Sequence, residues 1–342
     1  MNLEPDWLQP QLTALLAGRA TLHHALLVTG PPGIGKEWLA RKLGAALVCE
    51  SPGSDGRACG ACPSCRWTAA GSHPDLRIVR PDADEPDSGE TEPSASRSGA
   101  KPSRDIRIEQ IRALAGFAET ASHRGGRKAV LIVPADAMNL AAANALLKTL
   151  EEPHPGTHFI LVTSRPERVG PTVRSRCRKL QLRPPEPLIA QAWVAQATGA
   201  DATRAQAWLA LAAGAPLRAV ELAQGEGGRA LESLIELIGG LPGDALAAAE
   251  SMAEHEPRVW APALHAWSID LARCAAGAAP ARFPRQSKRL QELARRIDRD
   301  ALLSFESWLA GLARVVTHPL SAQLLAEDAL LRYQSVFIQT RA

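Results

Sequence analysis

The chain has 342 residues, of which 46% are hydrophobic, 22% charged and 4% aromatic. This length allows two or three domains, and the composition excludes a peptide hormone, a bare linker and a chain that is disordered throughout. The 39 lysines and arginines outnumber the 36 aspartates and glutamates by three, and a formal charge of +3 does not by itself indicate nucleic-acid binding.

The sequence favours a cytoplasmic protein with no membrane partner. No segment approaches the roughly 18 consecutive apolar residues that a membrane helix needs. Residues 1–6 are acidic and interrupted by proline, unlike a secretory signal.

The first half alternates short apolar runs with segments of helical periodicity. The runs typical of buried strands lie at 25–28, 76–79, 130–133, 159–162 and 180–182. The helical segments include 38–48, 108–114 and 141–150. Strands that alternate with helices predict βαβ crossovers and a buried parallel sheet. We therefore expect residues 1–183 to form one α/β domain.

Residues 82–104 interrupt this domain. They carry six acidic residues followed by three basic ones, with almost no apolar side chain. Such a segment cannot bury enough surface to order itself, and we expect a surface insertion between a strand and a helix.

The second half has helical patterns and no convincing strand after Pro184. One amphipathic stripe, typical of a core or a subunit interface, is formed by Phe305, Leu309, Leu312 and Val316. Glycine-rich stretches at 225–228 and 239–243 divide this half. We predict a small helical domain over 184–226 and a helical bundle over 227–342.

Residues 30–36 read Gly-Pro-Pro-Gly-Ile-Gly-Lys, directly after the first predicted strand and directly before a helix. This context is typical of a phosphate-binding loop. Backbone N–H groups would surround the phosphate oxygens, and the lysine would contact the β- and γ-phosphates. The candidate nucleotide-binding residues are Gly30, Pro31, Gly33, Gly35 and Lys36.

Two elements depart from the pattern of ATP-hydrolysing proteins. Glu37 stands where a Ser or Thr hydroxyl should hold Mg²⁺, and its charge would lie beside the γ-phosphate. The strand that should end in catalytic carboxylates runs into Pro134 and Ala135, and the first carboxylate is Asp136. We expect a retained loop that hydrolyses nothing, with binding of ATP or ADP left open. The alternative is an active ATPase with unusual ligands.

Four cysteines follow in a C-x₉-C-x₂-C-x₂-C pattern: Cys49, Cys59, Cys62 and Cys65. Gaps of two residues let thiolates converge on one metal, and four thiolates suit a structural Zn²⁺ site with no open position. An iron–sulfur cluster and unmetallated thiols are the alternatives, whereas disulfides fit poorly without an export signal. Cys177 and Cys274 stand alone, and we expect ordinary buried thiols.

Seven lysines and arginines lie between residues 165 and 183. They include the triplet Ser175-Arg176-Cys177, just before the last predicted strand of the α/β domain. An arginine at this position can project from the domain edge and stabilise transition-state charge on a neighbouring subunit's γ-phosphate. The alternative is a solvated basic face.

Four features resemble the bacterial clamp-loader AAA+ proteins in order and spacing. They are the phosphate loop, the four-cysteine insertion, the run Ala-Asn-Ala-Leu-Leu-Lys-Thr-Leu-Glu-Glu-Pro at 143–153 and the Ser-Arg-Cys triplet. An intact triplet beside degraded ATPase elements is similar to the delta-prime type more than to the gamma/tau type. The resemblance is strong over 22–185 and weak over 186–226, where residues 214–218 look like a sensor-2 region. Beyond residue 226 it rests on helical character alone.

This resemblance implies a RecA-like AAA+ domain with a zinc module at about 49–70, a helical lid domain and an all-α collar that assembles with gamma/tau and delta subunits. It implies a subunit without ATP turnover of its own that helps to load the sliding clamp on primed DNA. Arg176 would complete the ATP site of the adjacent gamma/tau subunit, with Ser175 and Cys177 holding its backbone. The resemblance also makes the four cysteines zinc ligands and Arg218 a sensor-2 arginine.

Two other functions remain as alternatives. One is a self-sufficient ATPase of the gamma/tau type, which the phosphate loop favours and Glu37 opposes. The other is a zinc protein that reads DNA sequence. The cysteine module gives it little support, because it carries only Arg57 and Arg66 and little aromatic surface.

Overall fold

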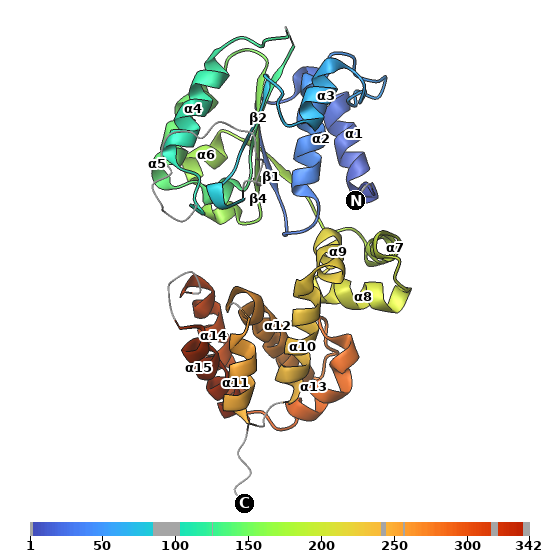
Figure 1. Cartoon of the computed structure of the whole chain (residues 1–342), viewed down its shortest axis with the longest axis vertical. Helices are drawn as coiled ribbons and strands as arrows, with labels where there is room; N and C mark the ends of the chain where they lie inside the picture. Colours follow the sequence, from blue (N-terminus) through green and yellow to red (C-terminus); the bar gives the residue numbers. More distant parts are fainter. Residues whose placement is uncertain are drawn as a thin grey trace, which may run out of the picture. The chain divides into compact units, whose positions relative to one another are not determined.

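The computed structural model describes residues 3–84, 103–124, 126–240, 244–255, 257–315 and 321–337. The chain separates into two compact units, Asn2–Pro185 and Glu186–Ala342 (Figure 1). This boundary lies two residues beyond the predicted end of the α/β domain. The finer division of the second half at residue 226 stays a prediction.

The first unit is built on five strands. They are β1 (Ala25–Thr29), β2 (Leu76–Val79), β3 (Lys128–Ile132), β4 (Thr157–Thr163) and β5 (Arg178–Gln181). Their order is β2-β3-β4-β1-β5, and every neighbouring pair is parallel. Strands β1, β3 and β4 are buried along their whole length, which explains why they read as continuous apolar runs. The predicted parallel sheet is confirmed.

Helices cover both faces of this sheet. Figure 1 shows α1 (Gln9–Ala17), α2 (Lys36–Val48) and α3 (Pro63–Ala69) on one side. On the other side are α4 (Ile108–Glu119), α5 (Leu140–Glu151) and α6 (Pro171–Ser175). Apolar positions on α4 and α5, such as Ile111 and Leu146, belong to one buried cluster with Phe159 and Leu161 of β4. Short 3₁₀ turns complete the unit at Asp6–Leu8, Arg19–Thr21, Asp82–Asp84, Ala135–Ala137 and Pro166–Arg168.

The predicted insertion at 82–104 falls mostly outside the described residues, at 85–102. At its start, the 3₁₀ turn Asp82–Asp84 is held by an ion pair between Asp82 and Arg107. The expectation of a surface insertion stays a prediction.

Every regular element in the described part of the second unit is a helix. The first three are α7 (Pro187–Thr198), α8 (Ala202–Leu211) and α9 (Pro216–Gln224). The others are α10 (Glu226–Gly240), α11 (Ala245–Ala253), α12 (Pro257–Ala275), a 3₁₀ turn η6 (Pro284–Gln286), α13 (Ser287–Ala294), α14 (Arg299–Val315) and α15 (Ala322–Ser335). None of the described helices is long and apolar enough to cross a membrane.

Aromatic side chains fill the core of the second unit. Trp260, Trp267 and Tyr333 are fully buried, and the indole N–H of Trp267 donates to the Tyr333 hydroxyl at 2.8 Å. The predicted stripe on α14 is confirmed at Phe305, Leu309 and Leu312, which are all buried. Its fourth position, Val316, lies outside the described residues.

Candidate nucleotide site, metal centre and trans-acting arginine

The phosphate loop lies at the carboxyl end of β1 and leads into α2, as the sequence predicts. Gly30, Gly33 and Gly35 have φ values of +150°, +73° and +93°, which L side chains rarely adopt. A Cβ atom on Gly30 would also lie 2.6 Å from the Leu182 carbonyl oxygen. The loop therefore needs its glycines, and it keeps the backbone curvature that surrounds a phosphate.

Lys36 is buried at the start of α2, with 6% of its surface exposed. Its ammonium group donates to the Pro31 carbonyl oxygen of the same loop at 2.6 Å. Desolvation lowers the pKa of Lys36 to about 8, against the opposing attraction of Asp136. Lys36, the predicted phosphate-binding residue, thus lies within the loop and is already hydrogen-bonded to a carbonyl oxygen of the loop.

Glu37 is held by two arginines. Its Oε1 accepts from Arg41 Nε at 2.7 Å and also pairs with Arg80, which directly follows β2. Mg²⁺ at a phosphate loop takes a small hydroxyl ligand, whereas this carboxylate is larger and engaged with two guanidinium groups. The residues at this position therefore do not fit the Mg²⁺ ion of an ATP-hydrolysing site.

Asp136, the first carboxylate after β3, is held in the same way. Its Oδ1 accepts from the Thr163 hydroxyl at 2.5 Å, and its Oδ2 accepts from Arg165 at 2.8 Å. Only 3% of this side chain is exposed. Both lone-pair-bearing oxygens are engaged at the end of β4, so the carboxylate is poorly placed to orient an attacking water.

These arginine partners are what the sequence argument missed. Arg80 follows β2 and Arg165 follows β4, and the carboxyl ends of parallel strands share one edge of a sheet. That topology was the available signal. It would have placed two cations at the edge of the sheet where the phosphate loop lies.

The four cysteines converge, as their spacing predicts. Their sulfur atoms all lie within 4.8 Å of one another. The Sγ–Sγ separations are 3.7 Å for Cys65–Cys49 and 3.9 Å for both Cys49–Cys62 and Cys59–Cys65. A tetrahedron with Zn–S bonds of about 2.3 Å has edges of about 3.8 Å. The cluster can therefore hold one tetrahedral metal ion.

Backbone N–H groups shape this cluster electrostatically. Those of Cys62 and Cys65 donate to the sulfurs of Cys59 and Cys62 at 3.3 and 3.4 Å. Although desolvation opposes it, such donation lowers the pKa of Cys62 to about 6, in the direction that a thiolate ligand needs. Desolvation raises the pKa of Cys49, which is buried.

The cysteine module is tied to the rest of the unit through Glu50 and Arg124. Glu50 accepts from the Ser64 hydroxyl at 2.7 Å and from Arg124 Nε at 3.1 Å. The Arg124 guanidinium also lies 5.3 Å from the centre of the Trp67 ring on α3. Contacts of Arg124, in the segment before β3, therefore connect this segment to the cysteine module.

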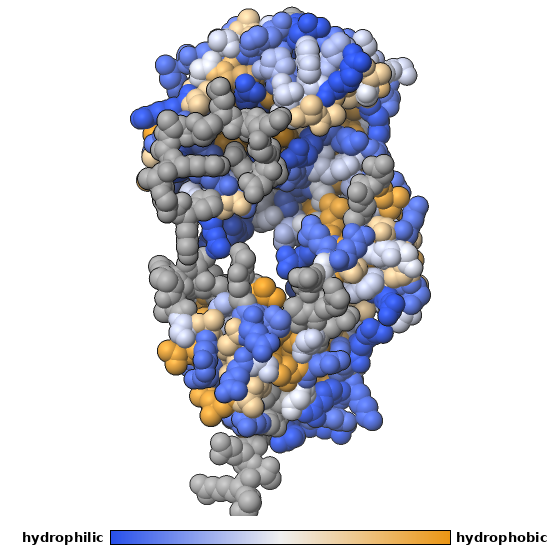
Figure 2. Space-filling view, viewed as in Figure 1, coloured by the Kyte–Doolittle hydropathy of each residue, from blue (hydrophilic) through white to orange (hydrophobic). Residues whose placement is uncertain are grey.

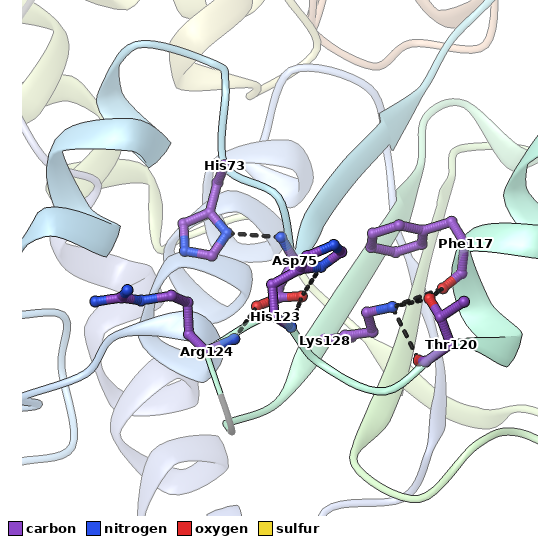
Figure 3. Close-up of polar contacts among 7 residues, drawn as sticks. All are labelled: His73, Asp75, Phe117, Thr120, His123, Arg124 and Lys128. Atoms are coloured by element: carbon purple, nitrogen blue, oxygen red, sulfur yellow. Dashed lines mark hydrogen bonds and ion pairs between the residues drawn. The ribbon is translucent and has the colours of Figure 1, made fainter.

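Two buried charged residues hold the segment before β3 at the amino-terminal ends of the strands (Figure 3). Asp75, 1% exposed, accepts from the backbone N–H groups of His123 and Arg124 at 2.8 and 3.2 Å. Lys128, also 1% exposed, donates to the carbonyl oxygens of Phe117 and Thr120 at 2.7 and 2.9 Å. Because each buried charge is matched by hydrogen bonds, this cluster serves a structural role.

Arg176 ends α6, just before the edge strand β5. Its Nη1 donates to the Thr172 carbonyl oxygen at 3.0 Å, and its guanidinium pairs with Glu151 at the end of α5. Of its triplet neighbours, Cys177 is buried, where desolvation raises its pKa to about 11. Ser175 is exposed, and its hydroxyl donates to the Thr172 carbonyl oxygen at 2.9 Å.

Arg176 cannot serve the phosphate loop of its own chain. Arg178 pairs with Leu26 in the parallel register of β5 and β1, so Arg176 lies level with the residue before β1. The loop begins at Gly30, at the other end of β1. About six residues of extended chain, or about 20 Å, separate the two positions. The partner Glu151 belongs to the run at 143–153, to which the sequence argument assigned no chemistry.

The remaining candidates belong to the second unit. Arg218 is exposed on α9 of the second unit, and its sensor-2 role stays a prediction. Cys274 is half-buried on α12, less buried than expected from the sequence.

The sheet order, with a phosphate loop after β1, defines a P-loop domain of the AAA+ class. Over residues 9–186, more than half of its length, the sequence matches the family described as "DNA polymerase III, delta subunit". The chain belongs to this family.

Curated relatives agree with that assignment. The DNA polymerase III subunit delta' of Pseudomonas aeruginosa is 41% identical over 189 residues, which are 55% of this chain and 52% of that protein. The delta' subunit of Escherichia coli K12 is 33% identical over 236 residues, 68% of this chain and 64% of that protein. The chain thus spans less than two thirds of either relative. A solved Thermotoga maritima protein related to the gamma subunit superposes with a TM-score of 0.49 at 18% identity, covering 95% of this chain and 99% of that one.

Proposed function

We propose that this chain is the delta-prime subunit of a DNA polymerase III clamp loader. In this role it hydrolyses no ATP and supplies Arg176 to the ATP site of an adjacent gamma/tau subunit. Family membership and the delta' relatives support the assignment. The observation that carries the division of labour is the contrast between two sites. Arg176 is held at a sheet edge far from its own loop, while Glu37 and Asp136 are engaged with arginines.

The test compares ATP turnover of the isolated chain with that of a complex reconstituted with gamma/tau and delta subunits. We expect no turnover by the isolated chain. Arg176→Ala should leave assembly intact and slow hydrolysis at the site that it contacts by up to roughly 10³- to 10⁵-fold. Arg178→Ala is the matched control, because this exposed arginine lies two residues away on β5. An unchanged rate with Arg176→Ala contradicts the role in trans.

The second candidate is an active ATPase of the gamma/tau type. The intact loop geometry and the buried Lys36 favour it. Steady ATP hydrolysis by the isolated chain that disappears with Lys36→Ala would establish this function in place of the first. Titration of the isolated chain with ATP and with ADP, followed by calorimetry, decides whether either nucleotide binds to the loop.

We propose that the cysteine cluster holds one structural Zn²⁺ ion. The sulfur separations match the edges of a zinc–thiolate tetrahedron, and four protein ligands leave no position for a substrate. The two Cys-x₂-Cys gaps place their thiolates on one short turn into α3, so the ion would connect the end of α2 to α3.

We propose gamma/tau and delta subunits as direct partners, with the sliding clamp and primed DNA reached through the complex. The helical unit offers a surface for assembly. Leu303 on α14 and Leu324 and Leu331 on α15 are 62%, 67% and 49% exposed. Figure 2 shows hydrophobic residues among polar ones over α14 and α15. Apolar residues at this exposure are typical of a surface that is covered in an assembly.

A further inference from the structure

A cavity of about 580 Å³ lies within the second unit, and none of the candidate site residues described above lines it. It opens between α8 and α9 on one side and α10 and the 3₁₀ turn η6 on the other. Its volume is in the range of about 300–1,000 Å³ that is typical of small-molecule sites. We call it the η6 groove.

The η6 groove is positively charged. Its charged lining residues are three arginines and one glutamate. The arginines are Arg204 on α8, Arg282 just before η6 and Arg285 in η6, and the glutamate is Glu236 on α10. Within the described residues, none of the three guanidinium groups has an ion-pair or hydrogen-bond partner on the chain. The groove therefore presents guanidinium groups, each with five N–H donors, that are free to bind an anion.

The segment that carries Arg282 and Arg285 is firmly held. The fully buried Asp270 on α12 accepts from the backbone N–H groups of Ala281, Arg282 and Phe283 at 2.8, 2.7 and 2.8 Å. Phe283, 2% exposed, packs with its ring centre 5.4 Å from that of Trp267. Little backbone freedom is left for a ligand to remove, which favours binding.

The other lining residues indicate that the ligand carries a nucleobase beside its anionic group, rather than further acidic groups. Trp208 on α8 is half-buried, and Gln224 and Gln286 also line the groove. The Gln224 Nε2 donates to the Ala197 carbonyl oxygen at 3.4 Å, which leaves its side-chain oxygen as an acceptor. An aromatic ring stacks on any base, amides hydrogen-bond base edges, and arginines contact phosphate oxygens. A poly-glutamate peptide would satisfy the arginines but would leave the indole ring without a planar group to stack on.

We propose that the η6 groove binds nucleoside phosphates, with Trp208 stacked on the base and the three arginines on phosphate oxygens. This proposal stands apart from the proposed function, in which the chain reaches DNA only through its complex. The same chemistry is offered by a free nucleotide and by a single strand, and the test separates the two sources.

The experiment uses the full chain and a fluorescein-labelled oligomer of ten thymidine nucleotides, followed by anisotropy over a range of KCl concentrations. We expect saturable binding in which Arg282→Ala or Arg204→Gln lowers the slope of log K against log salt by about 0.7 each. Trp208→Leu should weaken binding roughly 5- to 150-fold. A variant that only perturbs the structure would weaken binding without lowering the slope of log K against log salt by the amount expected for one phosphate contact. Melting curves identify any variant that fails to fold.

Arg295→Ala is the matched control, because Arg295 is an exposed arginine at the end of α13 outside the groove. Displacement by thymidine monophosphate at the same phosphate concentration assigns the groove to free nucleotides, and failure to displace assigns it to single strands. Three results would overturn the proposal. They are no binding of either probe, full binding by both Arg282→Ala and Trp208→Leu, or displacement by a poly-glutamate peptide but by no nucleotide.

Discussion

At the scale of single residues, the ion pair between Arg176 and Glu151 decides where the guanidinium points. Glu151 stands at the last position of α5 and is 49% exposed, and Arg176 is 34% exposed. Arg176 keeps further N–H donors beyond those given to Glu151 and Thr172, so the pair orients the group without consuming it. We regard Glu151 as a positioning residue.

Glu151→Gln should therefore slow ATP hydrolysis by the reconstituted complex by up to about fivefold, the usual strength of an exposed ion pair. The loss should be in kcat, with KM for ATP and assembly unchanged, and Glu151→Asp should recover part of it. Glu152→Gln is the control, because Glu152 is the next residue and is also exposed to solvent. Equal rates for the two variants would remove Glu151 from this role.

Lys36 gives the phosphate loop a defined pH dependence. Burial lowers its pKa from 10.5 to about 8, so the folded state releases this proton before the unfolded state does. Below pH 8 both states are protonated and the folded state bears the full cost of burying the ammonium group. Between pH 8 and 10.5 that cost disappears, and the Lys36 contribution to the free energy of unfolding rises with pH.

Urea unfolding of the chain and of Lys36→Met between pH 7 and pH 10 measures this contribution. We expect the midpoint of the native chain to rise relative to that of the variant as the pH increases. A constant difference between the two midpoints would show that the pKa of Lys36 is not lowered in the folded chain.

At the scale of elements, the five strands and the helices between them could be predicted because burial leaves a direct mark on the sequence. A parallel strand covered on both faces is mostly apolar, and the central residues of β1, β3 and β4 are apolar, while polar residues such as Lys128, Thr157 and Thr163 stand at the strand ends. The cysteine cluster could be predicted because its spacing is a property of one short segment.

The interactions that close the nucleotide site could not be read in the same way. Glu37 and Arg80 are 43 residues apart, and Asp136 and Arg165 are 29 apart. Nothing local to either residue indicates its partner, since the sheet order alone brings them together. Glu151 was missed for the same reason, because its helix-ending position gives a sufficient local explanation.

The cysteine module also allows an element-scale prediction. Cys59→Ser should reduce the zinc content from one ion per chain, measured by metal analysis, to well below one. Loss of the ion should loosen α3, because the Arg124–Glu50 pair alone does not close the turn, so amide hydrogens of α3 should exchange faster in the variant. Cys274→Ser is the control, since Cys274 lies outside the cluster. Full zinc content in Cys59→Ser would contradict the assignment of that ligand.

At the scale of the whole molecule, each of the two units has its own hydrophobic core. Residues of β1, β3, β4, α4 and α5 form one core, and residues of the helices from α10 to α15 form the other. Arg176 lies in the first unit, and the exposed leucines of α14 and α15 lie in the second. The proposed function thus separates catalytic assistance from assembly along the boundary at residue 185.

This separation predicts the behaviour of the isolated halves. Residues 186–342 alone should fold as a helical unit, bind the gamma/tau and delta subunits and compete with the full chain. They would bring no Arg176, so increasing amounts should reduce ATP turnover of the reconstituted complex to the level found with Arg176→Ala. Residues 1–185 should bind zinc but should neither compete nor restore turnover. Inhibition by residues 1–185 instead would place the assembly surface on the sheet unit and contradict the proposed collar.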